Sequence, residues 1–259
     1  MQSIREAAAV ILLRPSSLPG TGARSGFELL LVRRKRAASF MGSACVFPGG
    51  VIEDCDKGDM RFTAARELFE ESGILIKRRD CTPELRATLS PNNGAAAIDH
   101  IDAFALEFWS HWTTPSIEPK RYSTKFYLAV LPPDEHAAVD HNEAVEHFWV
   151  NPSEALVRAR ELALPPPQVR MCWELSRIPT IGHAFAAARG REAVNVMPRR
   201  LPGPELCLLM PWDPEYQSAG EGEAAPFSQR PSWAFGRSRF IYRDGSWHQV
   251  DAPVGISAG

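Results

Sequence analysis

The sequence predicts an α/β fold in which helices accompany a mixed β-sheet. Two apolar runs near the N-terminus, residues 7–13 and 27–32, lack a regular alternation of polar and apolar residues, so we expect strands that are buried on both faces. A helix is expected over residues 59–72, and residues 122–131 form an aromatic and β-branched strand. Helices placed between strands in this way are typical of the α/β class.

The composition is that of a globular protein. A chain of 259 residues with 44% hydrophobic content is long enough to bury a full core. A net charge of -2 gives no general attraction to nucleic acid or to a membrane surface, so neither is an expected partner. The apolar runs are much shorter than the roughly 20 residues of a membrane span. Five scattered cysteines without a C-x-x-C pair indicate a reducing compartment.

The helix over residues 59–72 has recognisable ends and one apolar face. Asp59 is suited to cap its start, and Gly73 stands where a left-handed C-terminal cap is expected. A short strand over residues 45–47 and the pair Gly49-Gly50 precede it, and the two glycines allow the backbone to approach a ligand closely. The residues on the apolar face are Phe62, Ala65 and Phe69.

Residues 77–119 are an irregular insertion. A strand is expected to begin near Ile74, and a helix is expected over residues 98–109, with Ile98, Ile101 and Phe104 on its apolar face. The aromatic residues near 109 are expected to pack in the core rather than line a substrate pocket. A connection of this length is usually functional or carries small elements of its own.

The C-terminal part continues with strand and helix signals. Residues 142–156 indicate a strand, a turn and the start of a helix that Ser153 would cap. Two helices follow, over 168–177 and up to about residue 189, and residues 239–250 form a hairpin with Asp244-Gly245 at its turn. We divide the chain into a domain over 1–164 and an extension over 165–259, which is expected to cover the core or to help a homodimer form.

The three acids Glu67, Glu70 and Glu71 carry the strongest functional signal. Because a helix turns about 100° per residue, their spacing places them in one stripe. Three like charges in one stripe destabilise the protein unless a cation neutralises them, and oxygen ligands suit Mg²⁺ or Mn²⁺. Acidic pairs on helices are often only solvated charge. The apolar opposite face, the two caps and the preceding glycine pair favour a metal-assisted site that cleaves a diphosphate.

On these residues the segment from Phe47 to Ile74 resembles the Nudix hydrolase superfamily. The second half of that family's signature, R-E-aliphatic-x-E-E-x-G-aliphatic, is matched completely from Arg66 onward. The loop before it departs from the pattern, because Gly50 lies two residues farther from Arg66 than in the family and Gly58 stands where the family has a Glu. We interpret this as a two-residue insertion. The acids that could replace the missing Glu are Glu53, Asp54, Asp56 and Asp59.

The resemblance implies an α/β/α sandwich that hydrolyses a nucleoside diphosphate linked to another moiety, with Mg²⁺ or Mn²⁺ as cofactor. The implied catalytic residues are Glu67, Glu70, Glu71 and Arg66, the last orienting a carboxylate. The implied metal ligands are the Gly50 carbonyl group, Glu67, Glu70, Glu71 and Glu143, which stands six positions before Trp149.

Residues 5–165 resemble in particular the acyl-coenzyme A diphosphatases of the nucleoside-diphosphate-linked moiety X motif 19 group, through FMGSACVFPGGVIEDCD and KRYSTKFYLAVLP. This implies cleavage of coenzyme A or its acyl esters to 3′,5′-ADP and (acyl)phosphopantetheine. The end Ser257-Ala258-Gly259 is not a peroxisomal targeting tripeptide, so a cytoplasmic location is expected. The candidate substrate-binding residues are Arg33, Arg34, Lys35 and Gly49, and Arg36, Lys120 and Arg121 are further candidates for the 3′-phosphate.

Two alternatives stay open. A Nudix hydrolase of ADP-ribose, NADH or nucleotide sugars would use the same metal site with a different pocket. A non-catalytic Nudix-fold binding module would be expected to have lost one or more of the acids, whereas all three are present here.

Overall fold

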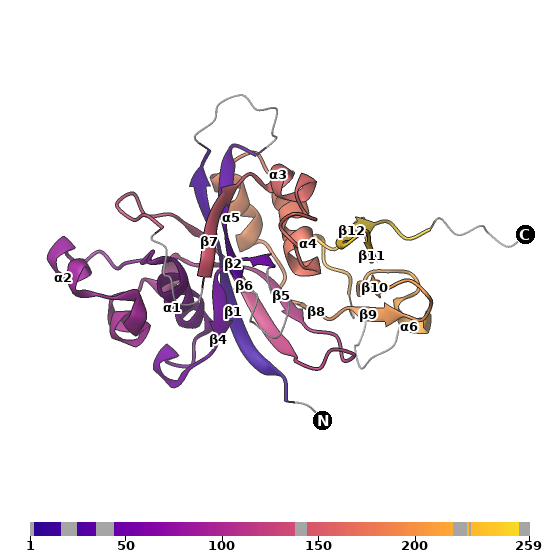
Figure 1. The fold of residues 1–259 in the computed structure, drawn as a ribbon, viewed down its shortest axis with the longest axis horizontal. Coiled ribbons are helices and arrows are strands. Elements are labelled where there is room, and N and C mark those ends of the chain that lie inside the picture. The colour runs from indigo at the N-terminus through magenta and orange to yellow at the C-terminus, as the bar shows by residue number, and fades with distance from the viewer. Residues whose placement is uncertain are drawn as a thin grey trace, which may run out of the picture.

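A mixed, eight-stranded β-sheet forms the centre of the fold (Figure 1). The structure is a computed structural model that describes residues 3–16, 25–34, 44–137, 144–219, 227 and 229–253. Six strands follow the order β3-β2-β1-β6-β5-β8, while β4 pairs with β1 and β7 pairs with β2. These strands are β1 (Arg5–Pro15), β2 (Phe27–Arg34), β3 (Cys45–Val46), β4 (Gly49–Val51), β5 (Glu107–Thr113), β6 (Tyr122–Val130), β7 (Ala144–Val150) and β8 (Asn195–Val196).

Strand β1 is buried on both faces, as its unbroken apolar run predicts. It pairs in parallel with β6 along its length and antiparallel with β2 and β4. Successive side chains of a strand point to opposite faces. Accordingly, Ile11 and Leu13 belong to one hydrophobic cluster and Val10 and Leu12 to another, on the other side of the sheet.

Helices cover both faces of this sheet. Helix α1 (Met60–Ser72) packs in the cluster that contains Val10 and Leu12. Helices α3 (Pro152–Val157), α4 (Pro166–Leu175) and α5 (Ile181–Arg189) contribute to the other cluster, and Figure 1 shows them on the opposite side of the sheet from α1. The predicted α/β/α sandwich with a mixed sheet is therefore confirmed.

The insertion differs from the sequence prediction. Residues 98–109 do not form a helix: η2 (Pro91–His100) and η3 (Ala103–Ala105) are short 3₁₀ turns, and β5 follows directly. Strand pairing of β5 with β6 overrides the helical spacing of the apolar residues. No strand begins near Ile74 either, although Ile74 is fully buried. A short helix, α2 (Pro83–Thr88), was not predicted.

The predicted packing of the aromatic residues near 109 is correct, because Trp109 and Trp112 belong to the larger core cluster. The cap of α3 was assigned to the wrong residue. Asn151, not Ser153, precedes the helix, and its side chain accepts a hydrogen bond from the Ser153 N–H at 2.9 Å. Pro152 then occupies the first helical turn, where its missing N–H costs nothing.

The C-terminal residues form a second, four-stranded sheet in the order β12-β11-β10-β9, together with the short helix α6 (Tyr216–Ala219). Its strands are β9 (Arg199–Leu201), β10 (Cys207–Leu209), β11 (Arg239–Arg243) and β12 (Ser246–Val250). The predicted hairpin is confirmed, with Asp244 and Gly245 both at positive φ. Leu208, Trp212 and Phe240 share the larger core cluster with β1 and β2. The division at residue 164 stays a prediction.

Two general features agree with the composition. All five cysteines are free. Within the described ranges, none of the helices has the length and apolar character needed to span a bilayer.

Candidate active site on the acidic face of helix α1

Helix α1 begins and ends where its capping residues predict. The Asp59 side chain accepts a hydrogen bond from the Arg61 N–H at 2.9 Å, which satisfies one of the free donors at the helix start. Gly73 adopts the left-handed conformation at φ 74°, and its N–H donates to the Phe69 carbonyl. Ala65 and Phe69 are fully buried. The helix is thereby fixed against the sheet, and its acidic face is turned toward β4.

Arg66 lies at the centre of the acidic face, and its side chain is only 1% exposed. It donates to both carboxylate oxygens of Asp56, at 2.8 and 3.0 Å. One of its nitrogens, Nη1, also donates to Glu67 at 3.0 Å and to Glu70 at 2.7 Å. A further hydrogen bond reaches the Val51 carbonyl group on β4 at 3.0 Å. One guanidinium group therefore holds three carboxylates together.

Asp56 is the acid that pairs with Arg66 from the lengthened loop. It is fully buried, and it accepts a hydrogen bond from the Glu53 N–H at 2.9 Å in a capping box around η1 (Asp54–Asp56). Burial alone would raise the pKa of Asp56, but the hydrogen bonds from Arg66 and from the Glu53 backbone lower it below its ordinary value. Of the other candidates in this loop, Asp59 caps α1 and Glu53 caps η1.

The carboxyl groups of Glu67 and Glu70 resist ionisation. Burial raises the pKa of Glu67 to about 7, and the charge of Glu70 adds to this effect, while Arg66 opposes it. Burial also raises the pKa of Glu70, again against Arg66. Since Arg66 is already paired with Asp56, its single positive charge does not neutralise all the acids around it. Negative charge in this part of the protein is under-compensated.

Glu71 and the glycine pair complete the acidic face. The Gly49 N–H donates to the Glu71 carboxylate at 3.0 Å. At Gly50, a β-carbon would lie 2.3 Å from Oε1 of Glu67, so only a glycine leaves room for that carboxylate. His147 on β7 donates from Nε2 to the Glu71 carbonyl oxygen at 2.8 Å and so joins the end of α1 to the sheet. Of the three acids predicted from the sequence, Glu67 and Glu71 therefore lie against β4, and Glu70 is joined to Glu67 through Arg66.

The profile of the NUDIX domain family matches residues 5–170, which is more than half of the chain. The chain belongs to the Nudix family. Residues 5–170 are accordingly a hydrolase domain.

This Nudix protein is similar to several curated proteins and solved structures. It is 33% identical over 193 residues to nudix hydrolase 7 of Caenorhabditis elegans, a match that covers 68% of this chain and 61% of that protein. Over an alignment 301 positions long it is 27% identical to the acyl-coenzyme A diphosphatase NUDT19 of Homo sapiens, and the match covers 79% of this chain and 80% of that protein. A Nudix hydrolase from Alicyclobacillus acidocaldarius superposes with a TM-score of 0.60 at 22% identity, covering 72% of this chain and 97% of that one, which supports the fold alone.

Nudix hydrolases generally use divalent metal ions, and the donor chemistry of this face fits such an ion. Glu67, Glu70 and Glu71 offer hard oxygen donors, and their uncompensated charge is what a cation would neutralise. Within the described residues, however, no three acidic, histidine or cysteine side chains already converge as a ligand set. Glu67 and Glu70 instead point to Arg66.

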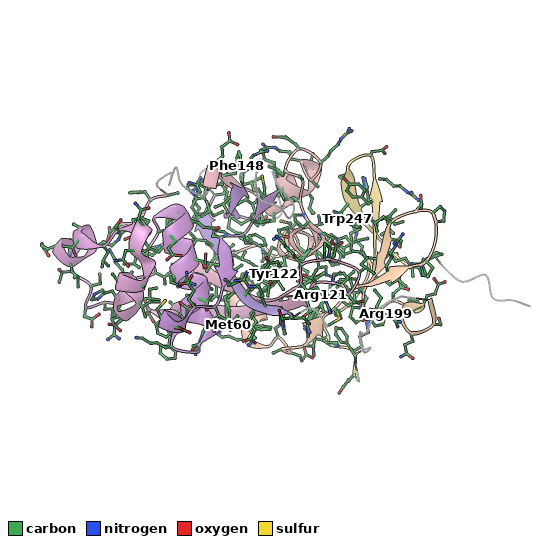
Figure 2. The ribbon with its side chains drawn as sticks, turned by 60° about the horizontal axis from the view of Figure 1, so that its bottom comes forward. Met60, Arg121, Tyr122, Phe148, Arg199 and Trp247 are labelled. Atoms are coloured by element: carbon green, nitrogen blue, oxygen red, sulfur yellow. The ribbon has the colours of Figure 1, made fainter. Side chains whose placement is uncertain are left out.

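The predicted substrate-binding and remaining metal-binding residues are placed as follows. Arg33 lies 3.0 Å from the Glu146 carboxylate and over the Phe148 ring. Arg121 is buried and donates to the Thr114 carbonyl group at 3.1 Å, and Figure 2 shows it on the side of Tyr122 that faces Arg199. These arginines are thus already engaged with protein groups. The side chain of Arg34 and all of Lys35, Arg36 and Glu143 lie outside the described residues.

Two contacts of this face were not predicted from the sequence. The contact of His147 with Glu71 depends on the pairing of β7 with β2, which brings together residues far apart in the sequence. Gly94, in the insertion, lies directly against Glu70. The only local signal for Gly94 is the Asn92-Asn93-Gly94 turn sequence, which says nothing of a contact with α1.

Proposed function

We propose that this protein is a metal-dependent diphosphatase that cleaves coenzyme A or acyl-coenzyme A to 3′,5′-ADP and (acyl)phosphopantetheine. The observation that carries the proposal is the pair of contacts on the acidic face of α1: the buried Arg66 donates to Glu67 and Glu70, and the Glu71 carboxylate accepts from the N–H of Gly49. The choice of a coenzyme A substrate is supported by the similarity to relatives named acyl-coenzyme A diphosphatase, of which the human protein is aligned over 80% of its length.

In this mechanism the residues of the chain position charge rather than form covalent bonds with the substrate. Mg²⁺ or Mn²⁺, held by Glu67, Glu70, Glu71 and the Gly50 carbonyl, with Glu143 as a further candidate, would supply an acidic water and neutralise the diphosphate. Arg66 orients Glu67 and Glu70 through hydrogen bonds to both. Glu67 would act either as a further ligand of the ion or as the base that accepts a proton from the attacking water.

The substrate is tested by incubating the full chain with Mg²⁺ or Mn²⁺ and a panel of coenzyme A esters, ADP-ribose, NADH and nucleotide sugars. Products are identified by mass spectrometry. Formation of 3′,5′-ADP from the coenzyme A esters is the expected result. Preferential cleavage of ADP-ribose, NADH or a nucleotide sugar would reassign the substrate, and no cleavage of any compound would indicate a non-catalytic binding module.

The role of the acids is tested with Glu67→Gln and Glu70→Gln. Each change removes a charge that the reaction needs, so kcat is expected to fall by roughly 100-fold to 10,000-fold while the protein stays folded. Glu118→Gln is the matched control, because Glu118 lies in the loop between β5 and β6, outside α1 and β4. Turnover near that of the control in either variant would refute the assignment.

A further inference from the structure

Gly94 of the insertion lies against the acidic face of α1. Gly94 is buried, and a β-carbon built on it would lie 2.1 Å from Oε1 of Glu70 and 2.6 Å from the carboxyl carbon Cδ. Both distances are far below any van der Waals contact, so the position of the Glu70 side chain requires a residue without a side chain at 94. The glycine is needed here for space.

The backbone around Gly94 is fixed by its neighbours. Ala97 and Ile98, three and four residues later, are buried in the cluster that contains the apolar side of α1. Asp99 forms an ion pair with Lys57 of the loop before α1, at 2.7 Å. The start of η2 is capped by Ser90, whose hydroxyl group accepts a hydrogen bond from the Asn92 N–H at 3.3 Å. The turn that carries Gly94 therefore has little freedom to move away from α1.

The Glu70 side chain, in contrast, has room to move. It is 32% exposed, and its other oxygen, Oε2, is held by Arg66 at 2.7 Å. The carboxylate is thus enclosed between a fixed guanidinium group and a fixed backbone segment, with solvent on the remaining side. If a methyl group were added at residue 94, the flexible end of Glu70 would yield before the backbone did.

We propose that Gly94 is a positioning residue: because it has no side chain, it leaves the Glu70 carboxylate its place on the acidic face of α1, where Glu70 would take part in metal binding. This inference rests on the proposed function, because it requires a divalent metal site on the acidic face of α1. It assigns a role to the insertion over residues 77–119: the insertion reaches the acidic face of α1 and sets the direction of one of the three acids. Gly94 itself offers no ligand atom to the reaction.

The test measures Mn²⁺ binding by the full chain, from the electron paramagnetic resonance signal of the free ion, with Gly94→Ala and the control Gly190→Ala. Gly190 has no neighbouring atom within 4 Å of an added β-carbon and no positive φ. Gly94→Ala is expected to raise the dissociation constant for Mn²⁺ by roughly tenfold or more, as for other residues that orient metal ligands. Its melting temperature should match that of the control, since only the end of Glu70 is displaced.

Repeating the measurement in a Glu70→Ala variant separates an effect on the position of the Glu70 side chain from an effect on folding. In Glu70→Ala the displaced atoms are absent, so adding Gly94→Ala should change Mn²⁺ affinity no further. Equal Mn²⁺ affinity in Gly94→Ala and the wild type would overturn the inference. So would an equally large loss of Mn²⁺ affinity when Gly94→Ala is added to Glu70→Ala. Failure of the wild type itself to bind Mn²⁺ would instead overturn the proposed metal-dependent function, and this inference with it.

Discussion

Arg66 divides its hydrogen bonds between a structural acid and two acids of the candidate active site. Asp56 is fully buried and takes two of its nitrogens, Nε and Nη2. Glu67 and Glu70 are more exposed and share the third, Nη1. A buried charge is tolerated only when it is paired and hydrogen-bonded. Asp56 therefore keeps the guanidinium group in place, and the guanidinium group in turn positions the two glutamates.

Replacing Asp56 with Asn is expected to lower the free energy of unfolding by about 3 kcal/mol at neutral pH, because Arg66 would lose its buried partner. Chemical denaturation of the two proteins measures the difference. Asp59→Asn is the control, since an Asn side chain also caps a helix well and should cost only a few tenths of a kcal/mol.

The pH dependence of the Asp56 contribution follows from its lowered pKa. The folded-state pKa lies below the ordinary value of 3.8, so the carboxylate adds stability above about pH 3.8, and this contribution is lost as the pH falls through the lower folded-state value. The stability gap between the wild type and Asp56→Asn should therefore narrow in acid. A gap that stays constant down to pH 2 would contradict the assignment of Asp56 as the ionised partner.

At the scale of single elements, local signals decide what a sequence can predict. The limits of α1 were predicted correctly because Asp59 and Gly73 form caps within the helix's own chain. The C-terminal hairpin was predicted from its Asp244-Gly245 turn for the same reason. Residues 98–109 were predicted wrongly, because their apolar spacing fits a helix and only the neighbouring strand β6 makes them extended.

Gly73→Ala tests the C-terminal cap of α1. An alanine at φ 74° places its β-carbon against its own backbone, so the free energy of unfolding should fall by about 1–2 kcal/mol. Thermal and urea denaturation measure this change. Gly73→Asn should lose less, since Asn tolerates the left-handed region. If the two variants lost equal stability, the left-handed cap would not be the cause.

In the candidate site too, features set by local sequence were predicted, and contacts between distant segments were not. The spacing of the three glutamates on α1 was visible in the sequence, because it depends only on the helical period. Which of four loop acids replaces the missing Glu was left open, and the pairing of Asp56 with Arg66 and the contacts of His147 and Gly94 were not predicted. These contacts join segments that are distant in the chain, and only the folded arrangement brings them together. The catalytic and metal-binding roles of the acids stay predictions.

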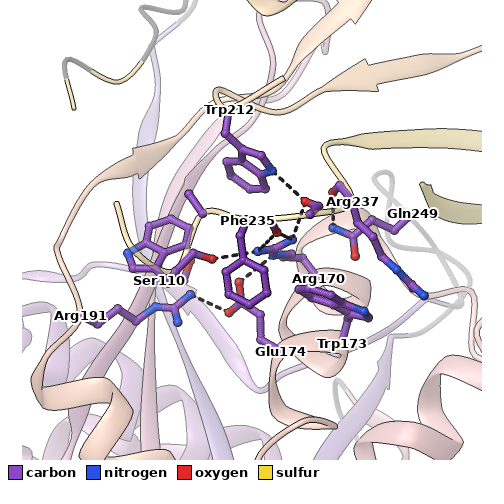
Figure 3. Close-up of polar contacts among 12 residues, drawn as sticks. Ser110, Arg170, Trp173, Glu174, Arg191, Trp212, Phe235, Arg237 and Gln249 are labelled. Carbon is purple, nitrogen blue, oxygen red and sulfur yellow. Dashed lines mark hydrogen bonds and ion pairs between the residues drawn. The ribbon is translucent and has the colours of Figure 1, made fainter. Parts of the chain in front are cut away.

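At the scale of the whole molecule, a buried charge network joins α4 to segments that follow it in the chain. Glu174 on α4 accepts hydrogen bonds from Arg170 at 2.7 Å and from Arg191 at 2.6 Å (Figure 3). Arg170 also donates to the Trp233 and Phe235 carbonyl groups, at 3.1 and 3.2 Å. One carboxylate thus serves two buried arginines, and the backbone carbonyl groups accept the remaining hydrogen bonds of Arg170.

Glu174→Gln should therefore destabilise the protein far more than an exposed pair of the same spacing. It leaves two buried guanidinium groups without a counter-charge, and a loss of about 3–5 kcal/mol is expected. Glu154→Gln breaks the exposed pair with Arg158, also four residues apart, and should cost less than about 1 kcal/mol. Denaturant titration of both variants gives the comparison. Similar losses in the two would show that the network does not support the fold.

Arg191 joins the parts of the chain in a second way. Its guanidinium group lies between two indole rings, 4.2 Å from the centre of Trp109 on β5 and 4.4 Å from that of Trp233 in the C-terminal segment. A cation held against an indole alters its light emission, and here both indoles share one cation only while the two segments are in contact. The intrinsic tryptophan fluorescence should therefore change when the segment that carries Trp233 separates from β5. A Trp233→Phe variant would identify the part of the fluorescence that comes from the contact of Arg191 with the two indole rings.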